Sequence, residues 1–147
     1  MKLILIVEDE YGNAEVLRML FEAHEYRVSL AANGKDALEL LAGEKPALIL
    51  SDFMMPHMNG AELGLAIRAD EALRDIPFVF MSGTNEDVIR RSFDGYDAFV
   101  RKPFEMDALQ RTLEYLMENG RPARVRDPEV DESMRHLLRG IDIPPEG

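Results

Sequence analysis

Short apolar runs alternate along the chain with longer segments in which apolar residues recur at helical spacing. The apolar runs cover residues 3–7, 27–31, 47–51, 78–81 and 96–100. The helical spacing is found at residues 14–21, after Asn33, after Gly60, after Thr84 and at residues 106–117. Strands that alternate with helices predict an α/β fold with a parallel sheet.

The apolar runs differ in how completely they exclude polar residues, and this difference predicts the strand order. Residues 3–7, 47–50 and 78–81 are apolar without a break, which is typical of central strands covered on both faces. Residues 27–30 alternate polar with apolar and residues 96–99 are mixed, so these two strands belong at the edges. The pattern predicts a doubly wound five-stranded parallel sheet of order 2-1-3-4-5, with helices on both faces. Ligands of such sheets bind beyond the carboxyl ends of the strands, where the winding reverses between strands 1 and 3.

Composition excludes several classes of protein. The 147 residues suffice for one domain with its own core. There are 28 acidic and 17 basic side chains, a net charge of −11 and no cysteine, which argues against nucleic acid or anionic membrane as a partner and against thiolate metal sites. The first apolar run stops at Glu8, short of the roughly 7 to 15 residues of an export signal. We expect a cytoplasmic protein without membrane insertion.

Polar side chains follow four of the predicted strands, at the edge where ligands bind. They are Glu8 and Asp9, Asp52, Ser82, and Lys102. Three converging carboxylates repel one another unless a cation neutralises them, and oxygen ligands suit Mg²⁺ or Mn²⁺. Mg²⁺ is commonly bound together with phosphate oxygens, which a hydroxyl and an ammonium group would also bind. A carboxylate beside a metal ion and a lysine can act as a nucleophile and form an aspartyl phosphate.

Four ordered motifs now identify a resemblance. They are Val-Glu-Asp-Glu at residues 7–10, Ser-Asp-Phe-Met-Met-Pro-His-Met-Asn-Gly at 51–60, Met-Ser-Gly-Thr at 81–84, and Phe-Val-Arg-Lys-Pro-Phe at 99–104. Residues 1–119 resemble the receiver domain of bacterial response regulators, of the single-domain type. The resemblance implies a flavodoxin-like fold and a phosphoacceptor signalling protein of two-component systems, which is not an enzyme in its own right.

The resemblance also implies roles for the acids. Asp52 would accept a phosphoryl group from a histidine kinase or a phosphotransfer protein. Asp9 and Asp52 would ligate Mg²⁺ directly, the backbone carbonyl of Met54 would be a third protein ligand, and Glu8 would act mostly through water. No other cofactor is implied.

Three further residues would respond to the phosphoryl group. By resemblance, Lys102 pairs with it and Ser82 donates a hydrogen bond to it, which draws the hydroxyl inward and lets Phe99 turn into the protein. The face made by the helix after Thr84, the strand at 96–100 and the helix at 106–117 then changes shape. A downstream protein target would bind there, or a second copy would bind through that face or through the tail.

Two regions depart from the family pattern. The stretch from Ser82 to Lys102 is somewhat short, and Tyr96 stands where a small residue is common, so we expect the helix after Thr84 to be short or irregular. Residues 120–147 are too few for a DNA-binding effector domain. Residues 128–139 have the charge and apolar pattern of a short amphipathic helix, and a disordered tail is the alternative.

Other functions share part of this chemistry. A metal-dependent phosphohydrolase with an aspartyl-phosphate intermediate usually has a second acid two residues after its nucleophile, and Met54 occupies that place here. A pseudo-receiver, which binds partners without phosphate, would not need the complete set of acids, serine and lysine. Flavodoxin-like cofactor binding needs a hydroxyl-rich loop after the first strand, where the acids at 8–10 would repel a phosphate.

Overall fold

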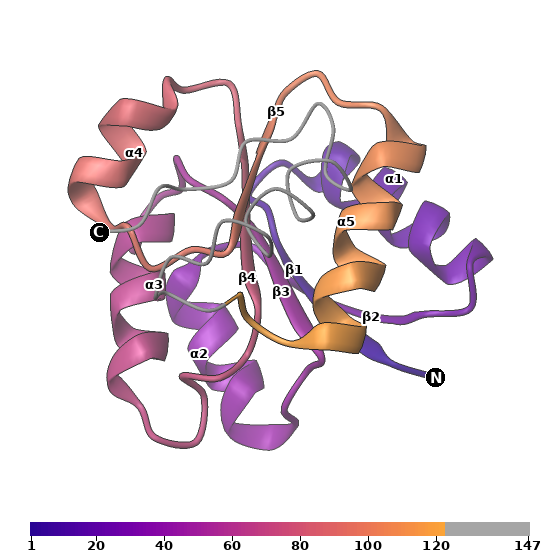
Figure 1. The fold of residues 1–147 in the computed structure, drawn as a ribbon, viewed down its shortest axis with the longest axis horizontal. Helices are drawn as coiled ribbons and strands as arrows, with labels where there is room; N and C mark the ends of the chain where they lie inside the picture. Colours follow the sequence, from indigo (N-terminus) through magenta and orange to yellow (C-terminus); the bar gives the residue numbers. More distant parts are fainter. Residues whose placement is uncertain (123–147) are drawn as a thin grey trace.

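The computed structural model describes residues 1–122, which form a five-stranded parallel sheet with helices on both faces (Figure 1). The strands are β1 Leu3–Val7, β2 Arg27–Ala31, β3 Leu48–Asp52, β4 Phe78–Ser82 and β5 Ala98–Arg101. The helices are α1 Tyr11–Ala23, α2 Gly34–Gly43, α3 Gly60–Ala69, α4 Glu86–Ser92 and α5 Met106–Asn119. The helix predicted at residues 128–139 lies outside the described residues. Of the predicted tail, residues 120–147, the structure describes only residues 120–122.

The strand order is β2-β1-β3-β4-β5, which confirms the predicted doubly wound sheet. The three central strands are almost completely buried, whereas edge strand β2 is exposed or half-buried over most of its length. Val7 lies beside Ser51, and Asp52 lies beside Met81. This parallel register brings the carboxyl ends of β1, β3 and β4 to one edge of the sheet, which we call the rim.

Each face of the sheet is covered by its own apolar layer. Alternate strand residues point to opposite faces, so Ile4 and Ile6 pack with α1 and α5, while Leu5 and Val7 pack on the side of α2 and α3. Figure 1 shows α1 and α5 together on one side and α2, α3 and α4 on the other. The burial of both faces explains why the central strands are apolar without a break.

Helix boundaries follow local capping chemistry. Asn33 accepts a hydrogen bond from the backbone N–H of Asp36 and caps α2. Asn59 caps α3, and Glu62 returns a hydrogen bond to the Asn59 backbone in a complete capping box. Helix α5 ends at Asn119 with Gly120 in a positive-φ conformation, which glycine adopts without strain. The shortness predicted for α4 is also confirmed, since it has seven residues.

The prediction for the last strand was wrong at its start. The strand was expected over residues 96–100 but begins at Ala98. The Asp97 side chain accepts a hydrogen bond from the Phe78 backbone N–H, and Tyr96 is buried among aromatic rings. These two residues therefore contribute side-chain contacts before regular strand pairing begins. β3, β4 and β5 each end one residue later than predicted, and β3 also begins one residue later.

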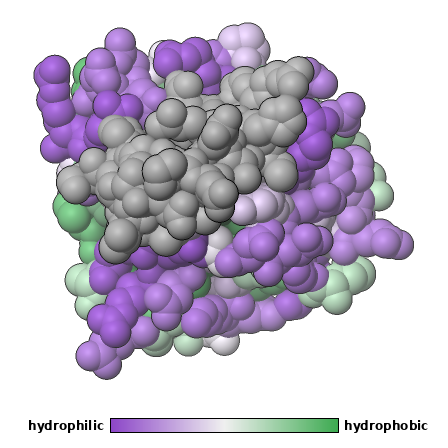
Figure 2. All heavy atoms as spheres, in the orientation of Figure 1, coloured by the Kyte–Doolittle hydropathy of each residue, from purple (hydrophilic) through white to green (hydrophobic). Residues whose placement is uncertain are grey.

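The visible surface is largely hydrophilic outside the grey segment, in keeping with the high charge of the chain (Figure 2). Among the described residues, no helix combines the length and apolar character that crossing a membrane requires.

Candidate functional site

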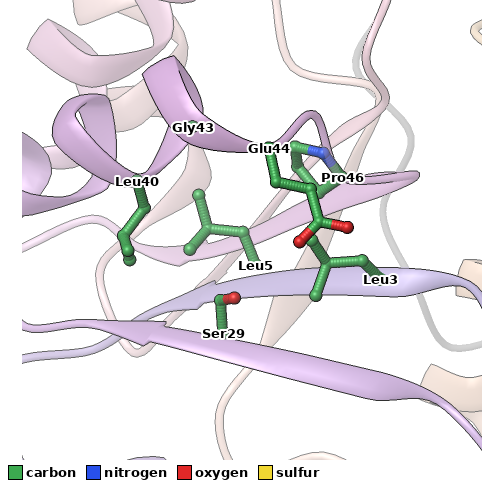
Figure 3. A pocket seen from close by; sticks show the side chains of 7 residues that line it. All are labelled: Leu3, Leu5, Ser29, Leu40, Gly43, Glu44 and Pro46. Carbon is green, nitrogen blue, oxygen red and sulfur yellow. The ribbon is translucent and has the colours of Figure 1, made fainter.

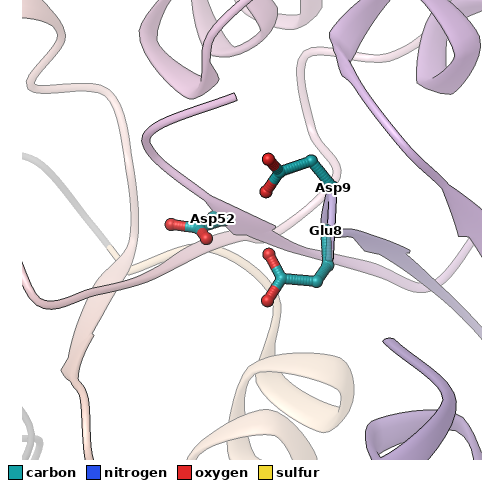
Figure 4. A group of neighbouring side chains, drawn as sticks. All are labelled: Glu8, Asp9 and Asp52. Carbon is teal, nitrogen blue, oxygen red and sulfur yellow. The ribbon is translucent and has the colours of Figure 1, made fainter. Parts of the chain in front are cut away.

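Three carboxylates meet at the rim. Glu8 and Asp9 directly follow β1, and Asp52 is the last residue of β3. One oxygen from each lies within 4.8 Å of the others, and Figure 4 shows the three side chains directed toward a common space. Because β1 and β3 are neighbours in parallel register, adjacent strand ends deliver all three acids. The predicted acidic cluster is therefore present.

Lys102 reaches this cluster from the end of β5. Its Nζ donates to Asp52 Oδ2 over 3.1 Å and to Glu8 Oε1 over 3.4 Å. Burial lowers the pKa of Lys102, but the nearby carboxylates of Asp52 and Glu8 outweigh burial and raise it. The peptide bond between Lys102 and Pro103 is cis. A charged ammonium group thus faces the acids.

Asp52 is held in one orientation. Its Oδ1 accepts a hydrogen bond from the Phe53 backbone N–H at 2.7 Å, while Oδ2 faces Lys102. The Asp52 side chain is 14% exposed. One oxygen is therefore anchored by the backbone, and the other is directed to the centre of the cluster.

Glu8 lies deepest in the cluster. Its side chain is 1% exposed, and Oε2 has no hydrogen-bond partner among the described residues. Burial raises the pKa of Glu8 to about 7, and the adjacent Asp52 carboxylate contributes to the rise. A buried carboxylate oxygen without a hydrogen-bond partner is costly, and a hard divalent cation would offset that cost. The donor set and the unpartnered oxygen therefore fit a Mg²⁺ ion.

The predicted switch residues lie on the adjacent strands β4 and β5. Ser82 ends β4 and is buried, and its Oγ accepts a hydrogen bond from the Thr84 backbone N–H at 3.0 Å. Phe99 is fully buried, with the Arg101 guanidinium 5.5 Å from its ring centroid. The Met54 side chain is exposed, and the role of its carbonyl as a ligand stays a prediction.

An apolar groove beside the acids was not foreseen. It has a volume of about 510 Å³ and runs between α1 and the segment that follows β5. Its walls include Val16, Leu20 and Phe104, and it reaches Glu8 and Lys102. The signal was present in the sequence, because Val16 and Leu20 lie off the inward stripe of residues 14–21 and are exposed.

A second hollow lies on another part of the sheet. It has a volume of about 190 Å³. Figure 3 shows its lining side chains, which come from β1, β2, the end of α2 and the segment that follows α2. Leu3, Leu5 and Leu40 make it largely apolar, and its one charged lining residue, Glu44, is paired with Arg27 among the described residues. It contains none of the rim acids, so the candidate site remains the rim.

Comparison with known proteins assigns this geometry to a family. The family model described as the response regulator receiver domain matches residues 4–114. The chain belongs to the response regulator receiver family. It is 35% identical over 117 residues to response regulator Rre1 of Synechocystis, covering 78% of this chain and 51% of Rre1. It is 33% identical over 116 residues to DivK of Brucella anthropi, a polar-differentiation response regulator, covering 76% of this chain and 93% of DivK. The chain thus spans about half of Rre1 but most of DivK.

Solved receiver structures agree with this fold. The receiver domain of a histidine kinase from Syntrophus aciditrophicus superposes with a TM-score of 0.75 at 30% identity, covering 87% of this chain and 96% of that one. The receiver domain of PA1611 from Pseudomonas aeruginosa has a TM-score of 0.73 at 28% identity, covering 80% and 98%. That structure has a magnesium ion coordinated in its active-site cleft.

Membership of this family settles the general class of function. Receiver domains are phosphoacceptor signalling modules of two-component systems, which partner histidine kinases, and are not enzymes in the ordinary sense. The cluster of Glu8, Asp9 and Asp52 corresponds to the acidic magnesium site of such domains.

Proposed function

We propose that this receiver accepts a phosphoryl group on Asp52 from a histidine kinase or a phosphotransfer protein, with Mg²⁺ or Mn²⁺ at the rim. The observation that carries the proposal is the arrangement of Asp52 between the Lys102 ammonium group and the other two acids. The cytoplasmic location expected from the sequence is part of the same proposal.

The anchored geometry of Asp52 favours one oxygen as the nucleophile. Oδ1 is occupied by the Phe53 N–H, so the attacking oxygen is Oδ2. A lone pair on Oδ2 forms the new O–P bond while the P–N bond to the donor imidazole breaks. The bonding pair stays on the imidazole nitrogen, which then takes up a proton. Lys102 exchanges its contact with the carboxylate for contacts with phosphoryl oxygens, where its positive charge stabilises the added negative charge.

The metal ion would be held by Asp9 and Asp52 directly, with the Met54 carbonyl as a third ligand and Glu8 through water. When bound, the ion neutralises negative charge on the phosphoryl oxygens. The unpartnered oxygen of Glu8 supports this assignment, since a cation would offset the cost of its burial.

The output would be a change in a protein-binding face. Ser82 and Phe99 lie on adjacent strands, and the Ser82 hydroxyl would donate a hydrogen bond to a phosphoryl oxygen. The surface of α4, β5 and α5 would then contact a downstream protein target or a second copy of the chain. The alternative phosphohydrolase lacks support, because the exposed Met54 side chain offers no acid beside Asp52.

Phosphoryl uptake tests the proposal directly. Incubation with acetyl phosphate and Mg²⁺ is expected to add one phosphoryl group per chain, read by intact-protein mass spectrometry. Excess EDTA is expected to reduce uptake to background, because the three acids would then repel the incoming phosphate. Uptake that persists unchanged in EDTA would contradict the metal assignment, and no uptake under either condition would favour a pseudo-receiver.

The groove along α1 supports a partner helix as the phosphodonor. An apolar groove that opens next to the nucleophile can receive the apolar face of a helix, and it reaches Glu8 and Lys102. A helix docked there would present its phosphohistidine to the rim. We therefore assign the kinase or phosphotransfer contact to α1 and the segment after β5.

A charge placed in this groove is expected to slow phosphorylation by a kinase domain but not phosphorylation by acetyl phosphate. The phosphodonor is an autophosphorylated kinase domain that phosphorylates the wild type. Leu20→Glu should slow phosphoryl transfer from this kinase roughly tenfold or more, because docking would bury the new carboxylate. Uptake from acetyl phosphate should change little. The matched control is Leu65→Glu, at an exposed position of α3 on the other side of the sheet. Equal slowing by both variants would contradict the docking assignment.

A further inference from the structure

A buried hydrogen bond joins the start of α4 to the chain just before β5. The Tyr96 hydroxyl donates to Glu86 Oε2 over 2.8 Å, and both side chains are buried. Glu86 lies in the first turn of α4, four residues after Ser82. Taking a carboxylate out of water is costly unless hydrogen bonds replace those of the solvent. The Tyr96 hydroxyl therefore holds Glu86 in this position.

The two ends of this hydrogen bond are fixed to different degrees. The Tyr96 ring packs against Phe80 of β4, with ring centroids 5.3 Å apart, and against Phe93 at 6.5 Å. The contact with Phe80 fixes Tyr96 to the sheet, whereas Phe93 directly follows α4. Helix α4, by contrast, buries only Ile89 and Glu86 among its seven residues. Phe93, directly after α4, packs on Phe78 and Phe80 and holds the C-terminal end of the helix to the sheet. A helix with so little apolar burial of its own is easily displaced at the other end, and the bond to Glu86 attaches that end, which is the one nearest Ser82.

Arg90 completes the arrangement from the next turn of α4. Its guanidinium lies 3.4 Å from Glu86 Oε2 and offsets the charge of the carboxylate. Burial raises the pKa of Tyr96, and the hydrogen bond to Glu86 raises it further. The hydroxyl therefore keeps its proton at neutral pH and remains the donor.

We propose that Tyr96 and Glu86 are positioning residues whose hydrogen bond holds the Ser82 loop in the place observed in this structure and so opposes the displacement of the loop on phosphorylation. This inference rests on the proposed function, in which Ser82 moves toward a phosphoryl group on Asp52. Residues 83–85 join Ser82 to Glu86, so a displacement of Ser82 pulls on Glu86 and strains its bond to Tyr96. A ligand that binds only when the loop is displaced has an apparent affinity equal to its intrinsic affinity multiplied by the fraction of molecules with a displaced loop.

The experiment measures the affinity for fluoroberyllate, a phosphoryl mimic, in the presence of Mg²⁺ by isothermal titration calorimetry. Tyr96→Phe keeps the ring and removes only the hydroxyl. We expect it to bind fluoroberyllate about three- to tenfold more tightly than the wild type, because the undisplaced state loses a hydrogen bond to a charged group. Glu86→Ala removes the other end and should tighten binding as well. The double variant should gain little beyond either single change, because both remove the same interaction.

Tyr26→Phe is the matched control. It removes a hydrogen bond of the same type, from the Tyr26 hydroxyl to Glu114 at 3.3 Å, on the α1 and α5 side of the sheet. This variant should lose some thermal stability and keep the wild-type affinity for fluoroberyllate. Unchanged or weaker binding by both Tyr96→Phe and Glu86→Ala, or equal tightening by Tyr26→Phe, would overturn the inference. Absence of binding by the wild type would instead refute the proposed function.

Discussion

Replacing Asp52 with asparagine is expected to abolish phosphoryl uptake from acetyl phosphate and Mg²⁺, with the intact mass left unchanged. An amide oxygen is a far weaker nucleophile than a carboxylate, and the substitution also removes one negative charge from the site that would bind the metal. The backbone N–H of Phe53 can still donate to the amide oxygen. The local structure should therefore persist while the chemistry is lost.

Stability and a matched variant separate loss of chemistry from loss of fold. Asp52→Asn relieves repulsion within the acidic cluster, so without metal the variant should unfold at a temperature equal to or above that of the wild type. Asp75→Asn makes the same chemical change at an exposed position before β4, and should leave uptake intact. If the Asp52→Asn variant still gained a phosphoryl group, the acceptor would have to be another residue.

Removing the Asp97 carboxylate is expected to lower the free energy of unfolding more than any other substitution considered for this protein. Asp97 is fully buried at the end of the sheet away from the rim and accepts three hydrogen bonds. The donors are the Phe78 backbone N–H at 2.8 Å, Arg68 at 2.9 Å and Arg121 at 2.9 Å. Breaking a buried ion pair by deleting one partner costs roughly 3–5 kcal/mol, because the remaining charge stays buried without its partner. Asp97→Ala should lower the free energy of unfolding by about that amount, measured by urea denaturation.

A surface ion pair provides the comparison. Glu44 pairs with Arg27 while both side chains stay about half exposed, so Glu44→Ala should change the free energy of unfolding little. Asp97→Asn keeps an acceptor for the Phe78 N–H but loses the charge, so its loss in free energy of unfolding should lie between those of Asp97→Ala and Glu44→Ala. If Asp97→Ala lowered the free energy of unfolding as little as Glu44→Ala, the hydrogen bonds and ion pairs of Asp97 would make no net contribution to stability. Such a result would leave the apolar layers as the source of stability.

The strand order and the acids of the site could be predicted from the sequence because each depends on local pattern. Residues 3–7, 47–50 and 78–81 exclude polar side chains since both of their faces are buried. In parallel strands, the residue that follows each run lies at the same edge of the sheet. Asp52 and Lys102 were therefore expected to meet, and their atoms lie 3.1 Å apart.

Other features depend on which side chains the fold brings together. Nothing near Tyr96 in the sequence shows that its hydroxyl meets Glu86, and nothing near Asp97 shows that it pairs with Arg68 and Arg121. These two polar contacts also explain why the strand predicted from residue 96 begins at Ala98. A mixed polar and apolar pattern indicates an edge, but it does not indicate which polar groups are paired.

The sequence by itself predicted the doubly wound sheet and the acids at its edge, since burial pattern and strand-end position are properties of short segments, and its motifs implied by resemblance that Asp52 is the phosphoacceptor. Only the tertiary structure decided the depth of Glu8, the groove beside α1 and the bond that ties α4 to Tyr96. The physical reason is that desolvation and hydrogen-bond pairing depend on neighbours supplied by other strands and helices. A carboxylate of the same sequence can be hydrated at the surface or, when neighbouring elements bury it, require a cation or a hydrogen-bond donor to offset the lost hydration.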